Sequence, residues 1–436
     1  MKKIALIGSG TSAIGFLTRM IESGIRNVQI DCFEQGKDLE NRIKSNDVIT
    51  GFGGAGTFSD GKLSISPEIG GDICDLIGET RYEDYIEDII QLWTRGKEVE
   101  RAKITDERIQ NLALNFRQNN LKLRISDFLH IGTDLLQEVL REIMAEFDKA
   151  HNLLNFHFNT FFDFDTIEDY DFAVIASGRY DNKSSKEIQK LLKRLKIDYK
   201  ENKIDIGVRY EVPCEITDWL TDLLYEFKVL GYSDTEEIVR TFCVNPKGFV
   251  VGEGGKDFSL VNGHSFLNRK SRNTNFAILV TQKFTEPFRD AYVYGSTLAM
   301  LANKLAGEGK ILVQRYGDYK LGRRTTERRI EKGFLTPTLK TASPGDLNLI
   351  FPRRIANSIS HFIEQMSTVI TGMNNPDNLL YGIEAKFYST KPVFTDPFRL
   401  GDKNIYLIGD ASGYTRGIVQ ATMSGVYLAD TILEQL

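Results

Sequence analysis

The chain has 436 residues, of which 41% are hydrophobic and 26% are charged, and its formal net charge is −5. This length exceeds what one hydrophobic core usually covers, so two interleaved domains are expected. The composition is that of a globular protein, and the acidic balance argues against a nucleic-acid-binding surface. The Lys/Arg-rich stretch 316–333 is an exception that we interpret as a solvated helix face.

Cysteine and histidine spacing indicates no metal site. The four cysteines are far apart with no C-x-x-C pair, and the five histidines form no H-x-x-x-H pair. The apolar N-terminus is interrupted at 8–12, and no uninterrupted apolar run approaches membrane-spanning length. We therefore expect a cytoplasmic enzyme without a transmembrane segment or a nucleic-acid partner. The cysteines are Cys32, Cys74, Cys214 and Cys243.

The N-terminus predicts a strand–turn–helix–strand unit. KIALIG (3–8) reads as a strand, GSGTSA (8–13) is a G-x-G-x-x-A turn, and the next residues have helical spacing. A second strand over 28–34 ends at Glu34. In such units the first Gly permits a tight turn, the second lets a pyrophosphate approach the helix N-terminus, and the acid accepts hydrogen bonds from a ribose. The pattern favours dinucleotide binding over a plain tight turn.

GFGGAGTFSDGKL (51–63) has the G-x-x-x-x-G-K spacing of a triphosphate loop. That loop needs a preceding buried strand and a Ser or Thr directly after the lysine, but Leu63 follows Lys62. An ATPase is therefore disfavoured. The glycines can instead lie flat against a planar or anionic group such as the flavin end of FAD, with hydroxyl donors beside them. A glycine-rich surface turn is the alternative.

The C-terminal part, residues 404–433, predicts a return to the same site. A short strand precedes Gly409-Asp410, and a helix opens at Gly417. In flavoproteins with this N-terminal unit, such an acid contacts the ribityl chain of FAD and the helix N-terminus faces the flavin. YDFAVIASGRY (170–180) adds a strand followed by Ser177-Gly178. FAD is therefore favoured over NAD, with an ordinary strand–loop–helix as the alternative.

These motifs predict a noncovalent FAD site and no metal ligands. The predicted cofactor-binding residues are Gly8, Gly10, Thr11, Ser12, Ala13, Glu34, Gln35, Gly53, Gly54, Ala55, Gly56, Thr57, Ser59, Lys62, Ser177, Gly178, Gly409, Asp410, Gly417, Ile418 and Val419.

The remaining segments predict an α/β protein. It would have a discontinuous Rossmann-like FAD-binding domain (1–180 and 381–436) and an inserted α+β substrate domain (181–380) containing an antiparallel sheet. Helices are expected over 82–96, 134–150 and 286–306, and near 353–371. Strands are expected over 155–164, 204–212, 240–252, 258–266 and 276–284.

Across nearly its whole length the chain resembles a family of FAD-dependent dehydrogenases of uncharacterised specificity. This family is distantly similar to the glutathione-reductase and geranylgeranyl-reductase flavoproteins. The resemblance is strongest at GGAGTFSDGKL (53–63), with further matches such as HIGTD (130–134), IGVRYEVP (206–213) and GYTRGIVQA (413–421). It implies a FAD-binding fold with an inserted substrate domain.

The chain departs from this family mainly at positions expected to face substrate. His264 stands where the family usually has Met, and Asn245 stands where it has a second cysteine. Ala385-Lys386 replaces Thr-Arg. The resemblance therefore does not supply the identity of the substrate.

Three residues are predicted to take part in catalysis, and a fourth, Arg269, is a further candidate for substrate binding. His264 is a candidate general acid or base, Tyr414 a candidate proton donor, and Arg209 a candidate clamp for a carboxylate or phosphate, as is Arg269. The alternatives are a turn residue for His264 and salt bridges within the sheet for the arginines. Cys243 is interpreted as structural because nothing in the sequence lowers its pKa.

The predicted function is that of a FAD-dependent dehydrogenase or reductase acting on a C–C or C–N bond of a small molecule. No second G-x-G-x-x-G is present, so NAD(P)H would visit only transiently as an electron donor. The substrate and the physiological electron donor or acceptor remain unknown. A flavin monooxygenase is an alternative, although GDASGYTRG (409–417) lacks the His and Pro usual in hydroxylases. A non-catalytic binding module is another alternative.

Overall fold

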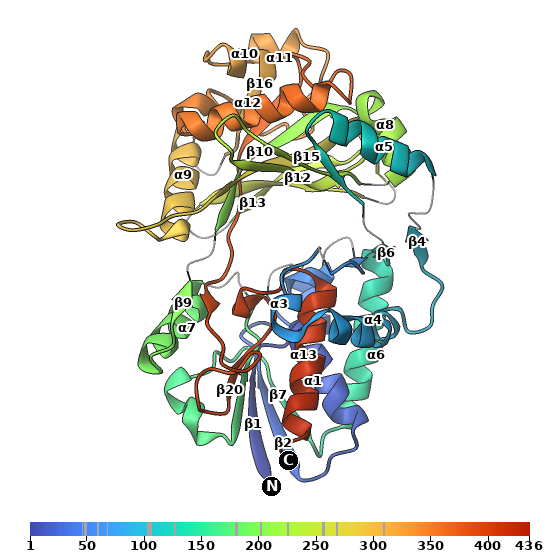
Figure 1. Cartoon of the computed structure of the whole chain (residues 1–436), viewed down its shortest axis with the longest axis vertical. Coiled ribbons are helices and arrows are strands. Elements are labelled where there is room, and N and C mark those ends of the chain that lie inside the picture. The colour runs from blue at the N-terminus through green and yellow to red at the C-terminus, as the bar shows by residue number, and fades with distance from the viewer. Residues whose placement is uncertain are drawn as a thin grey trace. The chain divides into compact units, whose positions relative to one another are not determined.

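The computed structural model describes all residues except 46, 48–49, 59–60, 68, 103–106, 126–127, 179–181, 201–202, 225, 255–257, 267–268 and 308–309. The chain forms two compact units (Figure 1). The first unit consists of Met1–Ala102, Ser126–Asn202 and Tyr388–Leu436. The second consists of Lys103–Ile125 and Lys203–Phe387.

The first unit is built on a five-stranded sheet of order β20-β8-β1-β2-β7, in which all neighbouring strands are parallel. Its central strand is buried on both faces from Ile4 to Ile7, as expected for a parallel sheet covered by helices. The strands are β1 (Lys2–Ile7), β2 (Val28–Phe33), β7 (Leu154–His157), β8 (Phe172–Ile175) and β20 (Ile405–Leu407).

Helices and short elements complete this unit. The helices are α1 (Thr11–Glu22), α2 (Leu39–Ser45), α3 (Cys74–Ile77), α4 (Glu79–Thr94), α6 (Thr133–Lys149), α7 (Asn182–Arg194) and α13 (Ile418–Leu433). The 3-10 turns are η1 (Ala55–Phe58), η2 (Phe164–Asp169) and η4 (Gly409–Ser412). The short strands are β3 (Lys62–Ser64), β4 (Glu100–Ala102), β6 (Phe128–His130), β9 (Tyr199–Lys200) and β19 (Lys391–Pro392).

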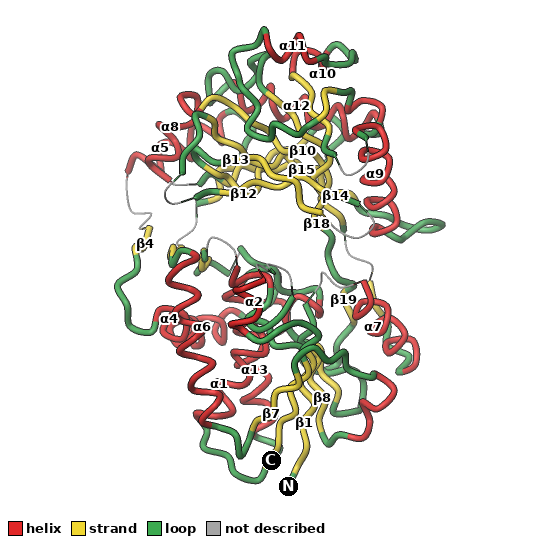
Figure 2. The backbone as a smooth tube through the Cα atoms, turned by 180° about the vertical axis from the view of Figure 1, so that it is seen from behind, coloured by secondary structure: helices red, strands yellow, loops and turns green. Residues whose placement is uncertain are grey.

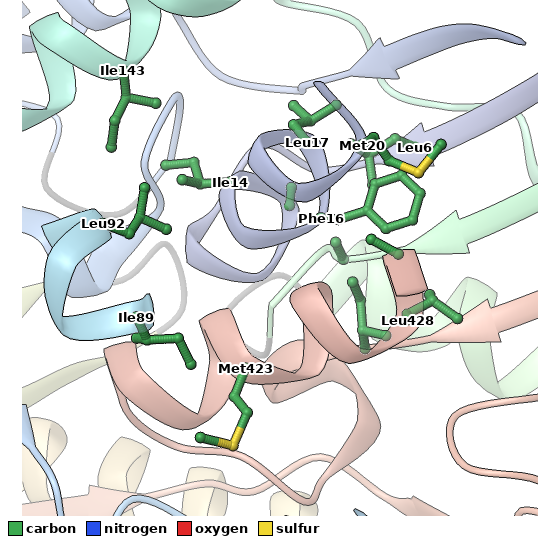
Figure 3. Packing of buried hydrophobic residues seen from close by; sticks show 14 of the residues in the cluster. Leu6, Ile14, Phe16, Leu17, Met20, Ile89, Leu92, Ile143, Met423 and Leu428 are labelled. Carbon is green, nitrogen blue, oxygen red and sulfur yellow. The ribbon is translucent and has the colours of Figure 1, made fainter. Parts of the chain in front are cut away.

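Helices α1 and α13 come from opposite ends of the chain and pack directly against each other (Figure 3). A Cβ atom at Gly425 would lie 1.9 Å from the Ser12 carbonyl oxygen, and one at Gly15 would lie 2.3 Å from the Thr422 carbonyl oxygen. Glycine at both positions lets the two backbones touch. Apolar side chains such as Ile14 and Met423 fill the core around the contact.

The second unit is built on an eight-stranded sheet of order β17-β16-β18-β10-β15-β12-β11-β5, antiparallel except for the β16–β17 pair (Figure 2). A separate hairpin pairs β13 with β14. The strands are β5 (Lys122–Arg124), β10 (Ile204–Pro213), β11 (Lys228–Tyr232), β12 (Ile238–Asn245), β13 (Phe249–Gly254), β14 (Ser259–His264), β15 (Asn273–Gln282), β16 (Leu312–Arg315), β17 (Ser343–Pro344) and β18 (Leu379–Lys386). The helices are α5 (Glu107–Gln118), α8 (Cys214–Leu224), α9 (Ala291–Ala306), α10 (Tyr316–Lys320), α11 (Glu327–Glu331), α12 (Arg353–Ser367) and the 3-10 turn η3 (Leu347–Leu349).

The predicted fold class, α/β with a Rossmann-like parallel sheet and a second part containing an antiparallel sheet, is confirmed. Several element predictions were wrong in detail. The expected strand over 240–252 is two strands, because the chain turns between Asn245 and Phe249. The strand expected over 155–164 ends at His157, where β2 stops pairing with it. Among the described residues, no helix is both long and apolar enough to cross a membrane.

Two further element boundaries differ from the sequence prediction. The helix expected from 286 begins at Ala291, where Asp290 accepts a 2.9 Å hydrogen bond from the Val293 N–H as an N-cap. The Lys/Arg-rich stretch 316–333 forms two short helices, α10 and α11, instead of one helix face.

The α1–α13 contact predicts a strong effect of Gly425→Ala. The added methyl group has no room against the Ser12 carbonyl, and overpacking of this kind costs about 1–3 kcal/mol. We expect a clearly lower midpoint of thermal unfolding. Thr431→Ala, on the same helix but partly exposed, is the control and is expected to leave the midpoint within a degree or two. Equal midpoints for Gly425→Ala and wild type would contradict the close contact.

Candidate functional site

The turn after β1 contains two glycines with different roles. Gly8 has φ +102°, and a Cβ there would lie 2.5 Å from the Ala176 carbonyl oxygen, so the fold itself requires glycine. Gly10 has an ordinary φ of −75°, and a Cβ would meet only the Gly54 Cα atom at 3.8 Å. No described atom comes closer to that Cβ position, so the turn has room for a ligand to approach its backbone.

Glu34, directly after β2, is held in one orientation beside this turn. Its Oε2 accepts hydrogen bonds from the Ser9 backbone N–H (3.0 Å) and hydroxyl (2.8 Å), and its Oε1 accepts one from the Gly36 N–H (2.7 Å). The residue is 6% exposed. A buried carboxylate fixed by three donors keeps further lone pairs for ligand hydroxyl groups.

The glycine-rich loop lies against the same turn. The Gly53 N–H donates to the Ser9 carbonyl at 2.9 Å, and Gly53 forms a parallel bridge with Gly10. A Cβ at Gly56 would lie 3.2 Å from the Ile418 side chain, which brings the start of α13 beside the loop. The loop therefore contacts segments from both the N-terminal and the C-terminal part of the chain.

Arg42 on α2 holds this loop in place, although the sequence analysis did not single it out. Its Nη1 donates to the carbonyl oxygens of Gly51 (3.2 Å), Phe52 (2.6 Å) and Gly54 (3.1 Å). The guanidinium also lies 3.7 Å from the centre of the Phe58 ring. Burial lowers the pKa of Arg42 to about 10, so the group stays charged at neutral pH.

The C-terminal motif reaches the same place. The Gly409 N–H donates to the Ser424 hydroxyl at 2.9 Å, and a Cβ at Gly409 would lie 2.4 Å from the Ser12 hydroxyl. Asp410 accepts a 2.9 Å hydrogen bond from the Thr415 hydroxyl. Gly417 then begins α13 as its N-cap residue.

Both helices begin without the usual neutralising groups. Neither α1 nor α13 has a side-chain cap at its N-cap glycine or an acidic residue in its first turn. Their first N–H groups and positive dipole ends suit an anion or an electron-rich group. Together with the space at Gly10 and the oriented Glu34 carboxylate, these features fit a phosphate-containing dinucleotide such as FAD.

Other predicted cofactor residues also lie in this first unit. Ser177 and Gly178 follow β8 next to Gly8, and Ser177 Oγ is buried with no hydrogen-bond partner in the described chain. Lys62 lies on β3, which packs against α13. The list is completed by Thr11, Ser12 and Ala13 at the start of α1, Gln35 after β2, Ala55 and Thr57 in η1, and Val419 at the start of α13; Ser59 lies outside the described residues.

A cluster of charged and aromatic side chains, which the sequence analysis also missed, adjoins the start of α13. Asp72 pairs with Lys391 Nζ at 2.5 Å and with Arg416 Nη2 at 3.5 Å. The Arg416 guanidinium stacks 4.2 Å from the Tyr388 ring centre, and its buried Nε has no hydrogen-bond partner in the described chain. These residues can be recognised as a cluster only in the folded structure, because Asp72 is far from the other three in the sequence.

Tyr414 belongs to this cluster. Its ring lies 4.5 Å from Lys391 Nζ, and its hydroxyl donates a long 3.4 Å hydrogen bond to the Pro392 carbonyl. Burial, together with the carboxylates of Asp75 and Asp72, raises the pKa of Tyr414. The phenol is therefore a weaker acid than an ordinary tyrosine, so it would give up its proton only to a strongly basic atom.

The other two predicted catalytic residues lie in the second unit. Arg209 is fully buried and donates to the Asn275 side chain (2.8 Å) and the Cys243 carbonyl (2.6 Å), with Glu384 at 3.5 Å. These contacts describe a structural role within the sheet. His264 ends β14 on the exposed side of the hairpin. A catalytic role for either residue stays a prediction.

The described residues contain no group of three or more His, Cys, Asp or Glu side chains placed to hold a metal ion. The cysteines in that part of the chain form no disulfide.

Residues 196–387 match the family described as "FAD-dependent protein, C-terminal domain-like". The matched segment covers most of the second unit, which is therefore similar to this family. The match ends at the last residue of that unit and supports FAD as the cofactor and a FAD-dependent oxidoreductase as the class of protein. A relative from Clostridium beijerinckii, described as an uncharacterized protein, is 24% identical, and the alignment covers 99% of this chain and 80% of the relative.

Solved structures show only distant likeness. One is 2,6-dihydroxypyridine-3-hydroxylase from Arthrobacter nicotinovorans, which is 10% identical, with a TM-score of 0.39 and coverage of 100% of this chain and 84% of that chain. Another is CtdE in complex with FAD and a substrate, which is 10% identical, with a TM-score of 0.35 and coverage of 99% and 80%. Likeness at this level assigns no activity to the chain.

The two glycines of the first turn predict separable effects. Gly8→Ala is expected to lower the thermal unfolding midpoint, because the methyl group collides with the Ala176 carbonyl. Gly10→Ala is expected to leave the midpoint of the FAD-free protein nearly unchanged but to weaken FAD binding about 10-fold or more. Calorimetry of FAD-free protein and FAD titration measure the two effects. Wild-type FAD affinity in Gly10→Ala would contradict ligand approach at this residue.

Proposed function

We propose that the chain is a FAD-dependent dehydrogenase or reductase that holds FAD noncovalently in its first unit. The observation that carries this proposal is the convergence of four segments, around Gly10, Glu34, Gly53 and Gly417, on the carboxyl end of β1. Two uncapped helix N-termini and one oriented carboxylate meet there. When bound, FAD supplies the redox chemistry by accepting or giving two electrons with a proton.

In this proposal different residues of the first unit bind different parts of the cofactor. The Glu34 carboxylate binds ribose hydroxyl groups, and the α1 N-terminus with Gly10 binds the pyrophosphate. Asp410 binds the ribityl chain. The glycine-rich loop that Arg42 holds, together with the start of α13, binds the flavin ring, whose electron-rich form the helix dipole stabilises.

The proposed substrate is a small molecule oxidised or reduced at a C–C or C–N bond. Tyr414 would act as the proton donor to a strongly basic atom, because its raised pKa makes it a weaker acid than an ordinary tyrosine. Arg416, with its unpartnered Nε, would contact an anionic part of the substrate or the cofactor. Substrate and electron partner are not identified by the residues of the site, and transient NAD(P)H remains one candidate donor.

Anaerobic reduction separates the proposed reaction from that of a monooxygenase. FAD-loaded protein is mixed with candidate reductants and substrates without oxygen, and loss of the visible absorption band is followed. A dehydrogenase is bleached by its substrate alone. A monooxygenase would instead consume oxygen only when a reductant and a second compound are both present, and it would hydroxylate that second compound. This result would contradict the proposal.

Glu34→Gln and Asp410→Ala are expected to weaken FAD binding about 10- to 100-fold, as expected for hydrogen bonds to a charged group worth about 1.5–3 kcal/mol. Fluorescence titration of FAD-free protein with FAD measures the change. Glu40→Gln, on the neighbouring helix α2 and exposed, is the matched control and is expected to bind FAD like wild type. Unchanged affinity in Glu34→Gln would remove the assigned ribose contact.

A further inference from the structure

Helix α7 of the first unit is amphipathic. Its buried side, formed by Ile188, Leu191 and Leu192 with Ser184, packs in a core cluster with residues of β8 and β20. The exposed side carries a row of cations three or four residues apart, which places them within an arc of about 100° on the helix. We call this row the basic stripe; it consists of Lys183, Lys186, Lys190, Lys193 and Arg194, all exposed.

Three cations of the basic stripe make contacts within the unit. Lys190 pairs with Glu187 at 2.7 Å, Arg194 pairs weakly with Asp165 at 3.5 Å, and Lys183 Nζ lies 3.5 Å from the centre of the Phe161 ring. The helix itself has five cations and one carboxylate, and the adjoining turn η2 adds the exposed carboxylates of Asp165, Glu168 and Asp169. The positive charge is therefore confined to the exposed side of the helix, where it attracts acidic groups over about a Debye length.

We propose that the basic stripe of α7 docks an acidic electron-carrier protein that exchanges electrons with the FAD of the proposed function. This inference rests on the proposed function. Its first support is position: Lys183 is five residues from Gly178 of the predicted cofactor site, so their Cα atoms lie at most about 18 Å apart. The N-terminal end of α7 is therefore near the turn after β8, and Arg194 lies about 16 Å further along the helix axis.

The second support is the chemistry of the stripe. The stripe is about 16 Å long. This length is similar to that of a charged patch on a small protein and is short for a surface that binds an extended polymer. Four of the stripe's five cations are lysines, whereas phosphate-rich ligands such as nucleic acids favour the forked contacts of arginine. The apolar residues Ile188, Leu191 and Leu192 of α7 are buried, whereas membrane-surface helices pair cations with exposed apolar residues.

The exchange balances when the carrier transfers one electron at a time. Two reduced carriers each lose one electron, and the bound cofactor takes up both electrons together with one proton from solvent. Oxidation of the cofactor by two oxidised carriers is the reverse. Two carriers must bind and leave one after the other, and weak binding guided by opposite charges allows this exchange.

Charge reversal in the stripe tests the proposal. The double variant Lys186→Glu/Lys193→Glu changes two exposed side chains whose removal breaks no hydrogen bond or ion pair of the described chain. The matched control is Arg26→Glu/Lys149→Glu, which reverses two exposed cations of the same unit before β2 and at the end of α6. The probes are reduced flavodoxin and a reduced 2Fe–2S ferredoxin, both acidic carriers.

Binding is measured by calorimetric titration at low ionic strength, and cofactor reduction by anaerobic stopped flow. We expect the stripe variant to lose 10-fold or more in carrier affinity and in second-order rate. The control should change less than 2-fold, and salt should slow the wild type. FAD content and reduction by dithionite should be equal in all three proteins.

Three results would overturn the inference while leaving the proposed function intact. These are dithionite-reducible FAD that neither carrier reduces, equal carrier affinity in stripe and control variants, and stripe-dependent binding to anionic vesicles or duplex DNA in place of the carriers. Protein that binds no FAD would overturn the proposed function itself, and this inference with it.

Discussion

The contact between α1 and α13 is the constraint on which the rest of the first unit depends. The two backbones approach so closely at Gly15 and Gly425 that no side chain fits between them. This contact brings the start of the chain's first long helix beside the start of its last one. The turn at Gly10, the glycine-rich loop and the Gly409-Asp410 turn then meet at the carboxyl end of β1, where parallel α/β sheets bind their ligands.

Charged groups and helix dipoles determine which ligands the carboxyl end of β1 can bind. Both helices present uncapped N-termini, and Arg416 and Lys391 share the single carboxylate of Asp72. The surroundings therefore favour negative charge, as a pyrophosphate and a reduced flavin ring require. Glu34 and Asp410 are carboxylates at the same place. Three donors keep Glu34 oriented for hydroxyl groups, and Asp410 accepts a hydrogen bond from the Thr415 hydroxyl.

The sequence predicted the parts of the site that depend on short-range chain geometry. Gly8, Gly10 and Glu34 are recognisable because a tight turn and a strand end need those residue types at fixed spacing. Arg42 was not predictable, because its role consists of three carbonyl contacts formed only after the loop at Gly51 folds back over α2. The cluster of Asp72, Lys391 and Arg416 joins segments more than 300 residues apart, and local patterns carry no trace of it.

The same reasoning explains the errors in the second unit. The stretch 240–252 is apolar and β-branched enough to read as one strand, and the turn after Asn245 became evident only from the pairing of β13 with β14. The roles of buried polar residues were equally hidden. The sequence did not show that the Arg209 guanidinium donates to the Asn275 side chain and the Cys243 carbonyl of its own sheet. Its role as a ligand clamp stays a prediction.

The visible absorption spectrum of the purified protein, before and after heat release of any chromophore, tests the central claim most directly. We expect the visible absorption bands of an oxidised flavin and the release of intact FAD into the supernatant. A colourless protein that also fails to bind added FAD would contradict it.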